Sequence, residues 1–186
     1  MPVTLDTHTA LVLIDLQHGT TSAPLAPHPL AEVVGRAAQL LAAFRQARRP
    51  VVIVTVNPAG SAQSRIRMQA PGPPAQLPAS FEQLLPGIGE QPGDIRIHKQ
   101  TWNAFYETPL HDELRQRGIT GLVLAGVSTS IGVEGTARAA AERGYNLAFA
   151  TDALTDRVAA AHANSLQHIL PRLGELGTTA EVLALV

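Results

Sequence analysis

Two charged side chains stand where acid–base chemistry is possible. Asp15 lies at the far end of an apolar run over 10–16, and Lys99, the only lysine of the chain, directly follows an alternating run over 94–98. Open α/β sheets bind ligands beyond the carboxyl ends of their strands, and both residues fall at such ends. We therefore expect the Asp15 carboxylate and the Lys99 ammonium to lie within about 4 Å of each other, or one water apart.

Each of these two residues also has a plainer explanation. Asp15 can cap the turn after its strand, and Lys99 can be a surface residue without a function. All thirteen other basic residues are arginines, however, and an ammonium is a compact point charge that a guanidinium does not replace. Pairing is expected to lower the pKa of Asp15 unless burial opposes it.

The third chemical feature is a turn rich in small residues, between an apolar run over 122–125 and a helical stretch over 133–141. The N-terminus of a helix offers unpaired N–H groups to an anion or a developing oxyanion. Thr129 or Ser130 is expected to cap this helix and to leave the amides of residues 131–133 facing a ligand. The alternative is an ordinary glycine-rich turn from a strand into a helix.

Strand and helix patterns alternate along the whole chain. Helices are predicted over 30–47, 109–117, 133–141 and 159–173, and strands over 10–16, 51–56, 94–98, 122–125, 147–150 and 178–186. This order predicts the α/β class, with a doubly wound, mostly parallel sheet that has helices on both faces, in a single domain over 1–186. A long loop is expected over 57–79, and one or two helical turns over 81–85.

The composition narrows the kind of partner. The formal net charge is −1, which gives no basic surface for nucleic acid, and no stretch approaches the roughly 18 apolar residues of a membrane span. The chain has no cysteine and so no thiolate zinc site. We expect a cytoplasmic protein with a small-molecule partner.

No cofactor or metal is expected. The chain has neither a P-loop nor a G-x-G-x-x-G motif after its first strand. His162 and His168 lack a third ligand in register, so a metal there is the weaker interpretation. Asp152 and Asp156 end the strand near 147–150 and can either reach the site or cap the next helix, which is the commoner role.

At this point the chain resembles the isochorismatase-like hydrolases, also called the cysteine hydrolase superfamily. Three segments carry the resemblance: Ile-Asp-Leu-Gln over 14–17, Lys-Gln-Thr-Trp-Asn-Ala-Phe over 99–105, and Gly-Val-Ser-Thr over 126–129 with Val-Glu-Gly-Thr-Ala over 133–137. It extends from about Leu11 to Asp156. It implies a doubly wound α/β fold, a homo-oligomer (a dimer or a higher assembly) and a cis peptide bond between Val127 and Ser128.

In most members of that superfamily an Asp, a Lys and a Cys form a catalytic triad. By resemblance the first two positions fall on Asp15 and Lys99, and the third falls on Gly132, so no thiolate nucleophile is available. Nicotinamidase-like members bind a metal through Asp-x-His after the second strand, and 57–76 contains neither residue. Isochorismatases themselves also carry Gly here, and the resemblance implies that Asp15 protonates a vinyl ether carbon and that water completes the hydrolysis.

We therefore expect a small-molecule hydrolase without a covalent intermediate, in which Asp15 is the acid/base, Lys99 its electrostatic partner and Gly132 replaces the thiol. The residues expected to contact substrate are Gln17, Trp102, Phe105, Ser128, Thr129 and Ile131. The aromatic pair among them can instead pack its loop against the sheet. The alternative function is a homologue that has lost catalysis and acts as a ligand-binding or interaction protein. A replacement nucleophile at Ser128 or Ser130 would need a base such as histidine, and none lies near in sequence.

Overall fold

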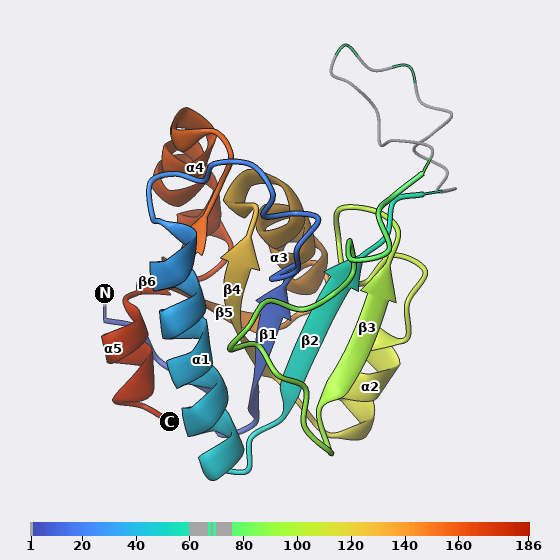
Figure 1. Ribbon diagram of the computed structural model, residues 1–186. Helices are drawn as coiled ribbons and strands as arrows, with labels where there is room; N and C mark the ends of the chain where they lie inside the picture. Colours follow the sequence, from blue (N-terminus) through green and yellow to red (C-terminus); the bar gives the residue numbers. More distant parts are fainter. Residues whose placement is uncertain (1, 60–66, 68, 70–75) are drawn as a thin grey trace.

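The computed structural model describes residues 2–59, 67, 69 and 76–186, and these residues form a layered α/β structure around one parallel sheet (Figure 1). In the sheet the six strands have the order β3-β2-β1-β4-β5-β6. The strands are β1 (Thr9–Ile14), β2 (Val51–Val56), β3 (Ile95–Lys99), β4 (Gly121–Val127), β5 (Asn146–Thr155) and β6 (Glu175–Gly177). Every strand pairs with its neighbours in parallel, which confirms the predicted fold class.

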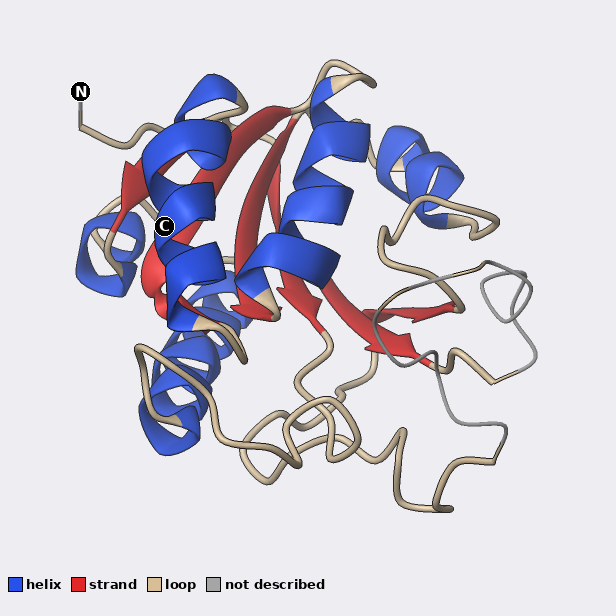
Figure 2. Ribbon diagram, turned by 90° about the horizontal axis from the view of Figure 1, so that it is seen from above, coloured by secondary structure: helices blue, strands red, loops and turns tan. Residues whose placement is uncertain are grey.

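The helical segments connect these strands and cover both faces of the sheet. They are α1 (Leu30–Gln46), α2 (Leu110–Gln116), η2 (Thr129–Val133), α3 (Glu134–Ala141), α4 (Ala159–Asn164), η3 (Ser165–Ile169), η4 (Leu170–Arg172) and α5 (Thr179–Leu183). Seen from above, helices lie on either side of the strands (Figure 2). Within the described residues, no helix is long and apolar enough to cross a membrane.

Strand residues alternate between two hydrophobic cores, one on each face. On β1, Val12 and Ile14 join the core formed with α2 and α3. Leu11 and Leu13 join the opposite core, formed with α1 and α5. A strand buried on both faces needs apolar residues at every position, which explains the uninterrupted apolar runs of the sequence.

The end of the chain differs from the prediction. The strand expected over 178–186 is wrong, because the last strand is β6 and residues 179–183 form the helix α5. A capping box starts this helix: the Thr178 hydroxyl accepts the Glu181 N–H at 3.2 Å, and the Glu181 carboxylate accepts the Thr178 N–H at 2.7 Å. Thr-x-x-Glu is the sequence signature of such a helix start, and it outweighs the short apolar alternation that follows.

Three other predictions need correction or restriction. Residues 81–85 form turns instead of helix, and Leu84 there pairs antiparallel with Gln17 in an isolated bridge. The helix predicted over 159–173 is divided into α4, η3 and η4. Most of the loop predicted over 57–79 lies outside the described residues.

Gly126 allows β1 and β4 to approach each other closely near their carboxyl ends. Its φ is +121°, and a Cβ at this position would lie 2.1 Å from the backbone oxygen of Ile14. No other residue fits such a contact, and glycine also has free access to positive φ. The pairing of β4 with β5 shifts register between Leu124 and Gly126. The segments that follow the two strands, from Asp15 after β1 and from Ser128 after β4, therefore begin close together.

Candidate active site

Asp15 and Lys99 form an ion pair at the carboxyl edge of the sheet. Asp15 follows β1 and Lys99 ends β3, so β2 lies between their strands. The Lys99 Nζ donates to Asp15 Oδ2 at 2.6 Å and to the backbone oxygen of Thr101 at 3.1 Å. The two residues are 4% and 2% exposed, respectively. The expected proximity of these two charges is confirmed.

Burial dominates the protonation of Asp15. Loss of solvation raises its pKa from 3.8 to about 6, although the charge and hydrogen bond of Lys99 act in the opposite direction. The lowering that pairing alone predicts is therefore overcome by burial. The second carboxylate oxygen, Oδ1, is buried and has no hydrogen-bond partner among the described residues. A carboxyl group in this state can both donate and accept a proton near neutral pH.

The backbone of Asp15 is fixed from both sides. Its N–H donates to the Val54 oxygen at 3.0 Å, which continues the sheet by one residue beyond β1. Its own oxygen accepts the Gln17 N–H at 2.9 Å and the Thr20 hydroxyl at 2.5 Å. These bonds hold Asp15 at a φ of 53°, a left-handed conformation that aspartate tolerates better than most residues. The side chain is thereby turned away from the path of the strand.

Gly132 lies against this carboxylate. A Cβ at Gly132 would be 3.0 Å from Asp15 Oδ2, 3.0 Å from Ile14 Cγ2 and 3.3 Å from the Val127 oxygen. The structure thus brings together Asp15, Lys99 and Gly132, the three residues that the sequence predicts as a catalytic group. Any side chain at residue 132 would therefore make close contacts with these neighbours.

The turn that carries Gly132 differs from the expected helix start. The predicted cis peptide bond between Val127 and Ser128 is confirmed. After it, η2 forms a π-helical turn in which the Ser128 oxygen accepts the N–H groups of Ile131, at 3.1 Å, and Val133, at 3.2 Å. The expectation that these two amides face a ligand is wrong, because the wider turn lets one carbonyl engage both of them.

Thr129 and Ser130 do not cap the helix either. The Thr129 hydroxyl donates to the Thr155 oxygen at 3.0 Å and lies 2.9 Å from Nδ1 of His162. Burial and the nearby His28 lower the pKa of His162, so its ring is neutral near pH 7. Ser130 donates its N–H and its hydroxyl to Asp156 Oδ2, at 2.7 and 2.9 Å. Both residues are directed at the end of β5 instead of the start of α3.

Gln17 is engaged within the protein. Its Oε1 accepts the Val56 N–H at 2.8 Å, and its Nε2 donates to the oxygens of Val56, at 2.9 Å, and Phe81, at 3.0 Å. The residue is 0% exposed. These bonds join the segment after β1 to the end of β2 and to the turns near residue 81. Its expected contact with a substrate stays a prediction, and the geometry supplies no free group for it.

Of the two aromatic residues expected to contact substrate, one is buried and the other is exposed. Phe105 belongs to a hydrophobic core, where its ring stacks on Tyr145 at 5.9 Å and lies under the Arg143 guanidinium at 5.1 Å. This is the packing alternative left open by the sequence. Trp102 is 55% exposed, and Ile131, beside Gly132, is 39% exposed. Of the apolar residues expected to contact substrate, these two face solvent.

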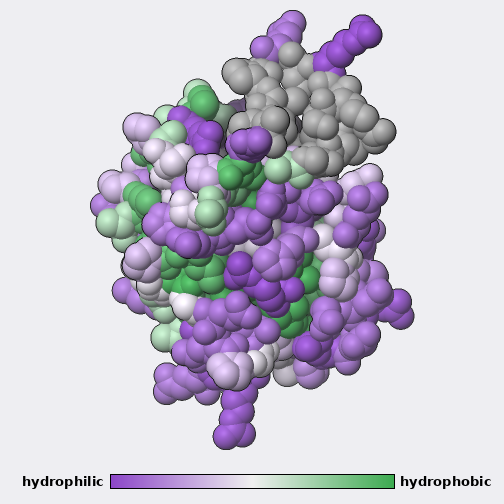
Figure 3. Space-filling model, turned by 45° about the vertical axis from the view of Figure 1, so that its right-hand side comes forward, coloured by the Kyte–Doolittle hydropathy of each residue, from purple (hydrophilic) through white to green (hydrophobic). Residues whose placement is uncertain are grey.

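A pocket of about 430 Å³ lies at the carboxyl end of β3, where Lys99 contributes to its wall. Its walls, as far as the described residues form them, are Asn57, Ala59, Glu82, His98, Lys99, Gln100, Tyr106 and Glu107. The face of the molecule on the β3 side is largely hydrophilic, with smaller hydrophobic areas between the polar ones (Figure 3). The volume suits a small molecule. Of the three residues predicted as a catalytic group, only Lys99 is among the described walls of this pocket.

Comparison with known proteins agrees with this geometry. Residues 9–181 match the sequence profile of the isochorismatase domain. The chain belongs to the isochorismatase family. Over 177 residues it is 43% identical to the isochorismatase family protein YecD of Escherichia coli O157:H7, covering 94% of each chain. Over 178 residues it is 38% identical to YwoC of Bacillus subtilis strain 168, covering 94% of this chain and 92% of YwoC.

A solved structure gives the same result. An isochorismatase family protein from Burkholderia thailandensis has a TM-score of 0.93 and 38% identity, over 99% of this chain and 98% of that one. Members of the isochorismatase family are hydrolases. The family and the fold are therefore those that the sequence motifs indicate.

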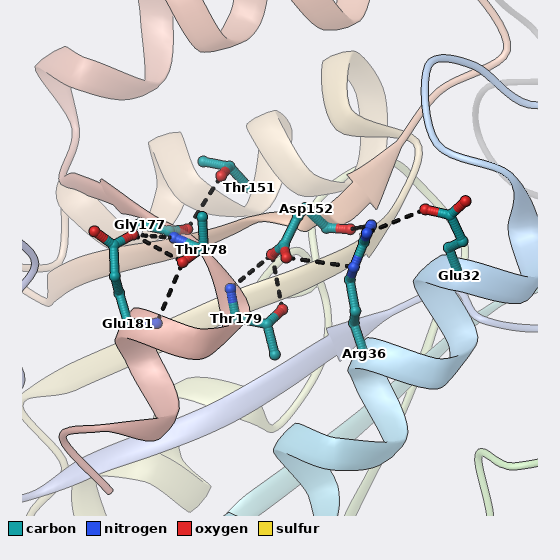
Figure 4. Close-up of polar contacts among 8 residues, drawn as sticks. All are labelled: Glu32, Arg36, Thr151, Asp152, Gly177, Thr178, Thr179 and Glu181. Carbon is teal, nitrogen blue, oxygen red and sulfur yellow. Dashed lines mark hydrogen bonds and ion pairs between the residues drawn. The ribbon is translucent and has the colours of Figure 1, made fainter.

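Two aspartates of this isochorismatase-family chain, which the sequence could not assign, have separate roles. Asp152 accepts the N–H and hydroxyl of Thr179 and pairs with Arg36, which connects β5 to α5 and α1 (Figure 4). Asp156 binds the turn that carries Gly132. The sequence suggested only a metal-ligand role for His162, but in the structure its Nδ1 lies within hydrogen-bond distance of the Thr129 hydroxyl. Across the part of the chain that the structure describes, no cluster of three His, Cys, Asp or Glu residues could hold a metal.

Proposed function

We propose that this isochorismatase-family protein is a hydrolase of a small molecule and that it forms no covalent intermediate. The observation that carries the proposal is the state of Asp15: a buried carboxyl with one oxygen that has no partner among the described residues, a pKa raised to about 6, and the bare backbone of Gly132 beside it. An acid with this pKa is protonated often enough at neutral pH to act as a proton donor. We infer that Asp15 is the acid/base and Lys99 its electrostatic partner.

The proposed reaction is the hydrolysis of a vinyl ether. The Asp15 carboxyl gives its proton to the terminal carbon of the double bond, and the carbon attached to oxygen becomes an oxocarbenium ion. Water adds to this carbon and returns a proton to the Asp15 carboxylate. The resulting hemiketal breaks its C–O bond to release a carbonyl compound and an alcohol. Lys99, 2.6 Å away, stabilises the carboxylate that exists between the two proton transfers.

Gly132 supports a route through water. The chain has no thiol. The Thr129 hydroxyl is fully buried and donates to the Thr155 oxygen, and the Ser130 hydroxyl is held by Asp156, whose carboxylate also binds the Ser130 and Val158 N–H groups. A nucleophilic serine needs a base that accepts its proton and is oriented for that task. A side chain at residue 132 would crowd the Asp15 carboxylate, whereas glycine leaves this carboxylate unobstructed on that side.

A second function remains as the alternative, a ligand-binding protein that has lost catalysis. The closed ion pair of Asp15 and Lys99 favours it, because a buried salt bridge also persists where it only fixes structure. Under both functions we propose a cytoplasmic protein with a small-molecule ligand and, from the family resemblance, a homo-oligomer. Light scattering of the purified protein tests the oligomer.

The test compares wild type with Asp15→Asn on a panel of vinyl ethers, including isochorismate, and small amides. As a hydrolase, wild type turns over at least one vinyl ether, and the variant loses about 10²- to 10⁴-fold in kcat. Mass spectrometry during turnover should find no adduct on the protein. If wild type binds a compound without turning it over, and Asp15→Asn binds it as tightly, the hydrolase is rejected and the binding protein stands.

A further inference from the structure

The contact between Gly132 and Asp15 depends on how the turn η2 is held. Within η2, the bonds to the Ser128 oxygen fix the turn's shape but not its place on the sheet. Its place is set by Thr129 and Ser130, which bind the end of β5. The strongest of these attachments is at Asp156, whose Oδ2 accepts two hydrogen bonds from one residue while the side chain is almost fully buried.

The same segment of β5 also holds the loop that follows Asp15. The backbones of Asp156 and Ala26 exchange two hydrogen bonds, at 2.7 and 3.0 Å. The Thr155 hydroxyl donates to the His28 oxygen at 2.8 Å, and Arg157 donates to the Thr20 oxygen at 3.2 Å. Thr20 in turn donates its hydroxyl to the oxygen of Asp15. Residues 155–157, at and just after the end of β5, thus bind the loop that follows Asp15, and Asp156 also binds the turn η2 that carries Gly132.

We propose that Asp156 is a positioning residue of this site: its carboxylate fixes the turn that carries Gly132, and its backbone fixes the loop that follows Asp15. Its importance for turnover rests on the proposed function, whereas its effect on the environment of Asp15 does not. Asp156 does not touch the reacting atoms under this proposal. It acts through Ser130 and the turn.

The chemistry of the contact explains why a carboxylate is needed. Both Asp156 oxygens face donors only: Oδ2 accepts from Ser130, and Oδ1 accepts the Val158 N–H at 3.1 Å. An ionised carboxylate is an acceptor at every site, whereas an amide of the same shape would direct an N–H₂ group at another donor. Asp156→Asn should therefore break the attachment of Ser130 or of Val158 with little change in volume.

The chain offers a matched control in Asp152. Its Oδ1 accepts the N–H of Thr179 at 2.6 Å and the Thr179 hydroxyl at 2.8 Å, the same pair of donors that Ser130 gives to Asp156 (Figure 4). Asp152 lies on the same strand, but its partners are α5 and Arg36 of α1. Asp152→Asn removes an equivalent set of bonds without touching η2 or the loop after Asp15.

The experiment is an NMR titration of the Asp15 carboxyl in wild type, Asp156→Asn, Asp152→Asn and Ser130→Ala. In wild type the pKa is expected near the value of about 6 that burial gives it. In Asp156→Asn the turn loosens, water reaches Oδ1, and the pKa should fall by about one pH unit toward its ordinary value. Ser130→Ala, which keeps the N–H bond and should fold in any case, is expected to show a smaller fall. Asp152→Asn should leave the titration unchanged, even where its melting temperature is lowered.

The proposal is overturned if Asp156→Asn and Ser130→Ala both titrate as wild type does, or if Asp152→Asn shifts Asp15 as strongly as Asp156→Asn. Should Asp156→Asn not fold, the comparison of Ser130→Ala with Asp152→Asn decides alone. With a vinyl ether substrate in hand, Asp156→Asn should lose about 100-fold in kcat with little change in KM. The titration needs no substrate, so failure of the proposed hydrolase and failure of the positioning role give different results.

Discussion

Lys99 and Asp15 meet beyond the carboxyl end of β2, the strand that separates theirs, and their charged atoms lie 2.6 Å apart out of contact with bulk solvent. Burial raises the pKa of Asp15 to about 6 against the opposing effect of Lys99. The pKa of Asp15 is therefore set by two opposing effects, the loss of hydration, which raises it, and the attraction of the Lys99 ammonium, which lowers it.

Removing the ammonium should shift this balance in one direction. Lys99→Met keeps an unbranched apolar chain and deletes the charge and the hydrogen bond that lower the pKa of Asp15. We expect the pKa of Asp15 to rise above about 6 in this variant, followed by NMR of its carboxyl group. Arg138→Met removes an exposed cation and should leave Asp15 as in wild type. A fall of the pKa in Lys99→Met would contradict this account.

Stability should depend on pH through Asp15. The carboxyl has a pKa of 3.8 in the unfolded chain and about 6 in the fold, so the folded state binds the proton more tightly. Its contribution to the free energy of unfolding is fully present below pH 3.8 and is lost as the pH rises to about 6. Between these limits wild type should lose about 3 kcal/mol relative to Asp15→Asn. Urea unfolding of both proteins at a series of pH values measures this, and parallel curves would refute it.

Gly132→Cys would restore the residue common to most of the superfamily and would be the only thiol of the chain. The new Cβ lies 3.0 Å from both Asp15 Oδ2 and Ile14 Cγ2, so we expect folding with a loss of about 1–3 kcal/mol. Native turnover should disappear because the new side chain presses on the Asp15 carboxylate. The variant should gain weak hydrolysis of an activated ester through its thiolate. Gly132→Ala is the control: it adds the same Cβ without a thiol and should have neither activity.

Gln17 should matter for folding more than for binding. Gln17→Leu leaves the Val56 N–H and the oxygens of Val56 and Phe81 without their present partners in a buried region. We expect the free energy of unfolding to fall by about 3 kcal/mol or more. The same replacement at the exposed Gln116 should change it by about 0.5 kcal/mol at most. Equal effects at the two positions would show that the Gln17 bonds contribute little.

The sheet and the central ion pair were predictable because they follow from periodicity. Apolar runs alternating with helical stretches specify parallel strands, and parallel strands place the residues after them at one edge. This pattern alone is enough to predict that Asp15 and Lys99 lie close together. The last helix was equally encoded, in the capping box formed by Thr178 and Glu181, although the residues after it also suit a short strand.

The remaining parts of the site depend on contacts between distant segments, which no local pattern reveals. Gln17 is occupied by partners 39 and 64 residues away. The place of η2 on the sheet is held by the bond from Ser130 to Asp156, 26 residues later. A sequence pattern names the residues able to make such bonds, but the choice among possible partners is made by tertiary packing.

Glycine at position 132 also affects the sensitivity of the site to oxidation and alkylation. Thiol hydrolases lose activity when their nucleophile is oxidised or alkylated, since a thiolate is the most readily modified group in a protein. Here the corresponding position offers peroxide and electrophiles nothing to attack, and no cysteine exists elsewhere in the chain. Hydrolysis through water would therefore continue under oxidative stress that silences relatives with a thiol.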